Sequence, residues 1–264
     1  MEKNRVKEIL RKEKGIAYGT VAQSCSPEGA EIAARAGLDF IIVDTEHTYF
    51  GLETSVNHFR AIEAHGATPI IRLPDDDPIA IAKALDSGAQ GILIPLVSTK
   101  EKAESIVRAT RYAPKGDRGM CPSCRATGQG LTPWQTYRKW SEEEVLVIAL
   151  IETVEGVKNI DEICQVEGLD VIALGPYDLS GDMGLNAQVE HPDVIANLIK
   201  VAETARRNGK DVLAFPSSSS PEQLKKAVDF WEPKGVRLFN YSCDTGAMVA
   251  QYGYVMASIK SWTK

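Results

Sequence analysis

The sequence lacks the marks of a secreted, membrane-spanning or nucleic-acid-binding protein. Its five cysteines are few and odd in number, which does not suit a disulfide framework. No apolar run approaches the roughly 20 residues that a membrane helix needs, and the opening MEKNRVKEILRKEKG has no apolar segment typical of a signal peptide. The net charge of −6 argues against a nucleic-acid partner. We therefore expect a cytoplasmic protein that binds neither membrane nor nucleic acid.

What the chain of 264 residues does have is eight short apolar runs, spread along its length. Near-continuous apolar runs indicate strands that are buried on both faces, as in a parallel sheet. The predicted strands begin near Gly15, Phe40, Pro69, Gly91, Val145, Val171, Val212 and Val236.

Helical patterns separate these runs, and several open on a capping residue followed by proline. These starts are Ser26-Pro27, Asp77-Pro78 and Ser220-Pro221. Eight strand–helix repeats predict an α/β protein, a (β/α)8 TIM barrel with eight parallel strands, formed as a single domain over residues 1–264. A short amphipathic helix around Val6 precedes it. A doubly wound open sheet is the alternative, but the count of eight and the missing GxGxxG after the first run favour the barrel.

Polar residues gather where the predicted strands end, which is where (β/α)8 barrels carry their chemistry. They are Asp44, Glu46, His47, Arg72, Glu152 and Asp178.

Glu152 and Asp178 follow neighbouring strands, whose axes in a sheet are about 4.8 Å apart. Two carboxylates so close repel each other unless a cation neutralises them, and an oxygen-only pair suits Mg²⁺ or Mn²⁺. The alternative is that each carboxylate pairs with a nearby base. Gly175 and Pro176 leave a slim turn whose N–H groups could face an anion, or they simply end the strand. The small residues that follow Asp178 predict a loop.

Arg72 and His47 are candidates for catalytic groups at the same end of the barrel. A fixed guanidinium stabilises negative charge that develops on an oxygen, although Arg72 could instead pair with Asp44 or Glu46. A histidine is a natural general base near neutral pH, although His47 could equally be structural. The spacing of Cys121 and Cys124 in CPSC lacks the context of a zinc or redox site, which favours two ordinary loop cysteines.

Six segments, taken in order, resemble the HpcH/HpaI aldolase family, which includes the metal-dependent 4-hydroxy-2-oxoheptanedioate aldolases. The resemblance runs from about Gly15 to Tyr252, and it rests on VDTEHTYFGLET, PIIRLPDDDP, ALDSGAQGILIPLV, RATRYAPKGDRG, IETVEGVKNIDEI and GPYDLSGDMG. It implies a class II aldolase that cleaves or forms 4-hydroxy-2-oxo acids, giving pyruvate and an aldehyde through a metal-bound pyruvate enolate. Decarboxylation of an oxaloacetate-type 2-oxo acid is one alternative, and a non-catalytic barrel that binds a 2-oxo acid is another.

The resemblance also implies roles for individual residues. Glu152 and Asp178 would hold the divalent metal, Mg²⁺ or Mn²⁺, with Co²⁺ or Zn²⁺ as alternatives. The turn of Gly175, Pro176 and Tyr177 would bind the pyruvate carboxylate through backbone N–H groups, and Arg72 would face the enolate oxygen.

His47 would transfer a proton, paired with Asp86 across a subunit boundary, and Asp44 would lie near the site. The family implies a homo-oligomer, a hexamer built as a trimer of dimers, in which a C-terminal helix at about 244–262 is exchanged between subunits. Leu150 stands where relatives often have glutamine, and Tyr177 where alanine is frequent, so the second substrate is open.

Overall fold

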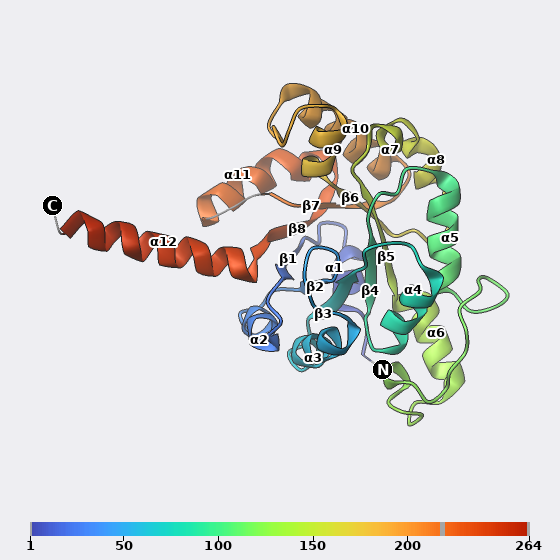
Figure 1. Ribbon diagram of the computed structural model, residues 1–264. Coiled ribbons are helices and arrows are strands. Elements are labelled where there is room, and N and C mark those ends of the chain that lie inside the picture. The colour runs from blue at the N-terminus through green and yellow to red at the C-terminus, as the bar shows by residue number, and fades with distance from the viewer. Residues whose placement is uncertain (1, 217–219, 263–264) are drawn as a thin grey trace.

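A computed structural model describes residues 2–216 and 220–262 of the chain. Within them, eight parallel strands close into a barrel in which each strand pairs with its sequence neighbours and β8 returns to β1 (Figure 1). This confirms the predicted barrel over the open sheet. The strands are β1 (Ala17–Ala22), β2 (Phe40–Asp44), β3 (Thr68–Arg72), β4 (Gly91–Ile94), β5 (Leu146–Ile151), β6 (Val171–Leu174), β7 (Asp211–Ala214) and β8 (Val236–Cys243).

Helices cover the outside of the barrel, and the predicted caps begin them. Ser26, Asp77 and Ser220 each accept a backbone N–H in the first turn of the helix that follows. The helices are α1 (Arg5–Leu10), α2 (Pro27–Arg35), α3 (Leu52–Glu63), α4 (Pro78–Asp86), α5 (Lys100–Thr110), α6 (Trp134–Glu144), α7 (Val154–Lys158), α8 (Ile160–Cys164), α9 (Pro176–Asp182), α10 (Pro192–Arg207), α11 (Pro221–Trp231) and α12 (Asp244–Trp262), with 3₁₀ turns at Arg125–Thr127 and Glu232–Lys234.

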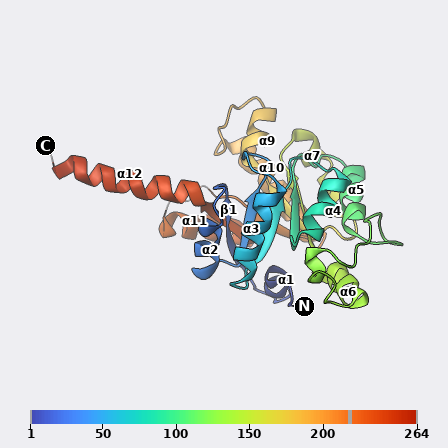
Figure 2. The same cartoon turned by 60° about the horizontal axis from the view of Figure 1, so that its bottom comes forward.

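The amino-terminal helix α1 closes one end of the barrel (Figure 2). Val6 is fully buried in the apolar cluster of the barrel interior. The Asn4 side-chain amide donates hydrogen bonds to the backbone oxygens of Gln90 and Glu144, at 3.1 and 3.0 Å. With α1 packed against this end, the cavity that reaches the barrel interior near Val21 and Leu150 lies at the carboxyl ends of the strands.

The alternation of side chains along each strand carries polar groups to the open end. Successive residues of a strand point to opposite faces, so every second residue faces the barrel interior. The interior cluster includes Ile42, Ile70, Leu150 and Leu238. Two residues further along the same strands, the inward positions are polar, and they are Asp44, Arg72, Glu152 and Asn240.

The segment after β6 is helical, whereas its small residues predict a loop. Pro176 occupies the first helical position of α9, and Leu179 is fully buried. Burial of this apolar side chain, together with a proline whose φ angle suits a helix start, outweighs the low helix propensity of Gly181. Asp178 therefore stands in the first turn of a short helix.

The long excursion between β4 and β5 is held by aromatic packing. Tyr112 and Trp134 pack edge to face with ring centres 5.0 Å apart, and Tyr137 stacks on Trp140 at 6.0 Å. Trp134, Tyr137 and Trp140 recur at every third position, a spacing that favours packing, and all three lie in this cluster. Cys121 and Cys124 are free thiols. In residues 2–216 and 220–262, no helix has the length and apolar character needed to cross a bilayer.

The last helix, α12, extends away from the barrel (Figures 1 and 2). It has no buried residue, although it carries eight large exposed apolar side chains: Met248, Val249, Tyr252, Tyr254, Val255, Met256, Ile259 and Trp262. Only its start is anchored, because the Asp244 carboxylate accepts N–H groups of Gln23 and Ser24.

Candidate active site

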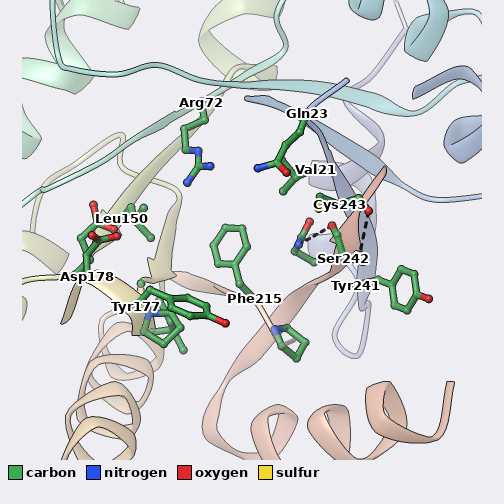
Figure 3. A pocket seen from close by; sticks show the side chains of 16 residues that line it. Val21, Gln23, Arg72, Leu150, Tyr177, Asp178, Phe215, Tyr241, Ser242 and Cys243 are labelled. Atoms are coloured by element: carbon green, nitrogen blue, oxygen red, sulfur yellow. Dashed lines mark hydrogen bonds between the residues drawn. The ribbon is translucent and has the colours of Figure 1, made fainter. Parts of the chain in front are cut away.

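A cavity of about 450 Å³ opens at the carboxyl ends of the strands (Figure 3). It collects residues that are far apart in the sequence, because all eight strands point the same way and end around one mouth. The lining residues are Val21, Gln23, Arg72, Leu150, Glu152, Leu174, Gly175, Pro176, Tyr177, Asp178, Phe215, Pro216, Asn240, Tyr241, Ser242 and Cys243. The predicted metal ligands, substrate turn and arginine are thus brought together.

Glu152 follows β5 directly and is only 4% exposed. Its Oε1 accepts the backbone N–H of Leu96 at 2.8 Å. Burial, with a smaller effect of the negative charges of Asp178 and Glu46, raises the pKa of Glu152 to about 7 against the effect of that hydrogen bond. The charged form of Glu152 is therefore costly in the metal-free site.

Gly175 makes room for the Glu152 side chain. A Cβ atom placed on Gly175 would lie 2.4 Å from Glu152 Cβ and 2.8 Å from its Oε2, closer than real Cβ contacts come. The N–H of Gly175 is already donated to Ile151 O at 3.0 Å, and Pro176 has no N–H. Any anion held by this turn must therefore be held by N–H groups further into the first turn of α9.

The residues at Glu152 and Asp178 fit a divalent cation. Both side chains line the same cavity, and the charge of Asp178 adds to the effect of burial in raising the pKa of Glu152. Carboxylate oxygens are the ligands that Mg²⁺ and Mn²⁺ prefer. In the part of the chain that the structure describes, no cluster of three or more His, Cys, Asp or Glu residues could hold a metal. A cation at this pair would complete its coordination with water or substrate.

Arg72 is held by Asp44 and also lines the cavity. Its Nε donates to Asp44 Oδ1 at 2.9 Å and its second terminal nitrogen donates to Oδ2 at 2.5 Å. Burial alone would raise the pKa of Asp44, but the hydrogen bonds and charge of Arg72 outweigh it and keep that pKa below its ordinary value. Arg72 is therefore paired with Asp44 and also faces the cavity, so the ion pair does not exclude a role in the site.

His47 and Asp86 do not meet within one protomer. The His47 side chain is 56% exposed, its Nε2 lies 3.5 Å from Glu46 Oε2, and it does not line the cavity. The Asp86 carboxylate, at the end of α4, accepts a hydrogen bond of 2.6 Å from the buried guanidinium of Arg118. The pairing of His47 with Asp86 across a subunit boundary stays a prediction.

Glu46, one of the polar residues that the sequence places at a strand end, has a buried Oε2 without a hydrogen-bond partner among the described residues, 3.4 Å from Arg72 Nε. The sequence interpretation left out two residues that line the cavity, Phe215 and Asn240. Phe215 and Asn240 stand two residues after the interior residues Leu213 and Leu238. The signal that could have identified Phe215 and Asn240 is the two-residue alternation, extended one step beyond each apolar run.

Comparison with known proteins gives consistent matches. The model of the HpcH/HpaI aldolase/citrate lyase family matches residues 18–238. A 4-hydroxy-2-oxo-heptane-1,7-dioate aldolase of Klebsiella pneumoniae is 37% identical over 187 residues, 70% of each chain. A 5-keto-4-deoxy-D-glucarate aldolase of Escherichia coli is 34% identical over 197 residues, 75% of this chain and 76% of that one. The crystal structure of citrate synthase SbnG matches with a TM-score of 0.86 and 33% identity over 98% of both chains.

Proposed function

The chain belongs to the HpcH/HpaI aldolase/citrate lyase family, and we propose that it is an aldolase that cleaves or forms 4-hydroxy-2-oxo acids. In the cleavage direction the C3–C4 bond breaks and its electron pair passes to the 2-oxo group, giving the enolate of pyruvate. The 4-hydroxyl loses its proton and becomes the aldehyde, and a proton then added at C3 completes pyruvate. The observation that supports this most strongly is the convergence of Arg72, Glu152 and Asp178 in one cavity.

Glu152 and Asp178 would hold a divalent cation, with Mg²⁺ or Mn²⁺ as the first candidates and Co²⁺ or Zn²⁺ as alternatives. Such an ion supplies a Lewis acid for the 2-oxo acid and neutralises the charge of the two carboxylates. Glu152 would be oriented by the Leu96 N–H and given room by Gly175.

Arg72 would stabilise the negative charge that grows on the 2-oxo oxygen. Its two hydrogen bonds to the fully buried Asp44 fix the guanidinium before substrate arrives, so little reorganisation accompanies the reaction. The family resemblance assigns the substrate carboxylate to the turn from Gly175 to Tyr177. Because the Gly175 N–H is donated to Ile151 O and Pro176 has none, the backbone N–H groups of Tyr177 and Asp178 are the candidates in this turn.

His47 would take the proton from the 4-hydroxyl, with Asp86 of a second copy orienting the imidazole. We propose for this reason that the protein acts as a homo-oligomer, and the family resemblance points to a hexamer arranged as a trimer of dimers. The exposed apolar side chains of α12 support an exchanged helix, because they stay in contact with water in a single protomer and would be buried against a second subunit.

Exchange of the methyl protons of pyruvate in deuterated water tests the proposed function, because it needs enolate formation but no aldehyde. With Mg²⁺ or Mn²⁺ the methyl signal in the NMR spectrum should decay, and a chelator should stop the decay. The Glu152→Gln variant should not exchange, whereas Glu155→Gln, the same change at an exposed position three residues further on, should exchange as the wild type does.

Absence of exchange with every divalent metal tried would refute the proposal. Exchange that accompanies decarboxylation of oxaloacetate, without aldol product from any aldehyde, would instead indicate the decarboxylase.

A further inference from the structure

The cavity is chemically divided, and one part of it is without charge. Arg72, Glu152 and Asp178 form a charged side, with the buried Asp44 behind Arg72. The other side, which we name the neutral side, is lined by Val21, Gln23, Phe215, Asn240, Ser242 and Cys243 from β1, β7 and β8 and the residues that follow them. In Figure 3 the Phe215 ring points into the cavity, with Asp178 and Arg72 on one side and Gln23 and Ser242 on the other.

Asn240 is the polar group of the neutral side that the fold places most tightly. It is 5% exposed and stands one inward step beyond Leu238 on β8. Its Nδ2 donates to the backbone oxygen of Ser242 at 3.0 Å. This bond fixes the orientation of the amide, because the reverse orientation would set Oδ1 against another carbonyl oxygen.

The Oδ1 of Asn240 has no hydrogen-bond donor among the described residues, although it is buried. Buried acceptors are nearly always paired, since leaving one unpaired costs about 1–3 kcal/mol. An apolar side chain of the same size would avoid this cost. A buried acceptor on a cavity wall, held by the bond to Ser242, is therefore suited to a donor that arrives with a ligand.

The other polar groups of the neutral side are already engaged. Gln23 Nε2 donates to Asp44 Oδ2 at 3.3 Å, and Gln23 Oε1 accepts from the Thr245 hydroxyl at 3.3 Å. The Cys243 sulfur accepts the N–H of Gly246 at 3.2 Å. The Ser242 hydroxyl donates to the backbone oxygen of Cys243 at 3.4 Å. Among the described residues of this side, Asn240 Oδ1 is therefore the buried acceptor that has no donor.

The cavity also lacks a cation for a second anionic group. Among its lining residues in the described part of the chain, Arg72 is the one basic side chain, and it is bound to Asp44 at 2.5 Å. A carboxylate on the neutral side would lose its hydration without gaining an ion pair, which is unfavourable.

We propose that the neutral side binds the aldehyde substrate and selects short, uncharged aldehydes whose hydroxyl donates a hydrogen bond to Asn240 Oδ1. This rests on the proposed aldolase function, which places the pyruvate part on the charged side. The Phe215 ring and Val21 would pack against the carbon chain of the aldehyde.

The test of the hydrogen bond compares glycolaldehyde with acetaldehyde, which have the same number of carbons and differ by one hydroxyl. We measure kcat/KM for each with saturating pyruvate, in the wild type and in Asn240→Leu. The ratio of kcat/KM for glycolaldehyde to kcat/KM for acetaldehyde should be about tenfold higher in the wild type than in Asn240→Leu, because the variant lacks one neutral hydrogen bond to the hydroxyl of glycolaldehyde. Comparing ratios cancels the intrinsic reactivity of each aldehyde. Asn57→Leu, the same change on the exposed face of α3, should keep the wild-type ratio.

The test of charge compares butanal with succinic semialdehyde, whose carboxylate lies two methylene groups from the aldehyde and so leaves its reactivity nearly unchanged. In the wild type, kcat/KM for butanal should exceed kcat/KM for succinic semialdehyde by about tenfold or more, because the carboxylate would lose its hydration without gaining an ion pair. Equal use of the two, or a preference for succinic semialdehyde, overturns the selection of uncharged aldehydes. An unchanged glycolaldehyde-to-acetaldehyde ratio in Asn240→Leu overturns the role of Asn240.

Pyruvate exchange, measured in the same preparations, distinguishes failure of the aldehyde subsite from failure of the aldolase function. Exchange in the wild type, combined with either of these negative results, refutes the aldehyde subsite and leaves the aldolase proposal standing. Absence of exchange with every metal, and of aldol product with every aldehyde, refutes both.

Discussion

Replacing Glu152 by glutamine should stabilise the metal-free protein at high pH while removing its response to metal. Burial raises the pKa of Glu152 to about 7 in the folded chain, above the ordinary 4.5 expected when unfolded. The folded state therefore holds the proton more tightly, and the free energy of unfolding falls as pH rises from about 4.5 to 7. At about 1.4 kcal/mol for each pKa unit, this fall amounts to about 3 kcal/mol.

Glutamine keeps an oxygen for the Leu96 N–H but carries no charge, so the free energy of unfolding of the variant should not fall over this pH range on account of residue 152. In chelator at pH 8, chemical denaturation should show the variant more stable than wild type by up to about 3 kcal/mol, with no difference near pH 4.5. Mn²⁺ at about 100 times its dissociation constant should stabilise only the wild type, by about 2.7 kcal/mol. A variant with the wild-type dependence on pH, or with equal stabilisation by Mn²⁺, would contradict this prediction.

Three further changes test the site and the assembly. Asp44→Asn removes the nearer of the two carboxylates beside the mostly buried Arg72 guanidinium and leaves Glu46 at 3.4 Å, so the free energy of unfolding at pH 7 should fall by about 2 kcal/mol or more in a urea titration; a loss below about 0.5 kcal/mol would show that the pair contributes little. Gly175→Ala puts a methyl group against Glu152, and calorimetry should detect Mn²⁺ binding at least about tenfold weaker, because the carboxylate must move; unchanged affinity would mean that Gly175 does not set its position. Removal of residues 248–264 deletes most of the exposed apolar surface of α12, and light scattering should show a smaller assembly; an unchanged mass would exclude this helix from the interface.

The barrel could be predicted because its strands are simple to recognise. Runs such as FIIVD and LVIALI are buried along their whole length, and capping residues with proline mark the helices between them. The helix at Pro176–Asp182 was missed because its small residues predict a loop, and its stability comes from burial of Leu179, which only the folded chain reveals.

The charged side of the site was also within reach of the sequence. A charged residue that follows an apolar run, as Arg72 and Glu152 do, is conspicuous against its neighbours. Asn240 and Phe215 are not conspicuous, because a lone amide or aromatic residue near a strand end resembles an ordinary turn or core residue. Their place in the cavity follows from barrel closure, which sets β8 beside β1 and turns their inward positions toward the mouth.

The central claim is that Glu152 and Asp178 together hold one divalent cation. Titration with Mn²⁺, followed by the electron paramagnetic resonance signal of the free ion, measures this directly. The account predicts one tight site per chain in the wild type and in Glu155→Gln, and loss of that site in both Glu152→Gln and Asp178→Asn. Tight binding of one ion in either of the last two variants, at wild-type affinity, would contradict it.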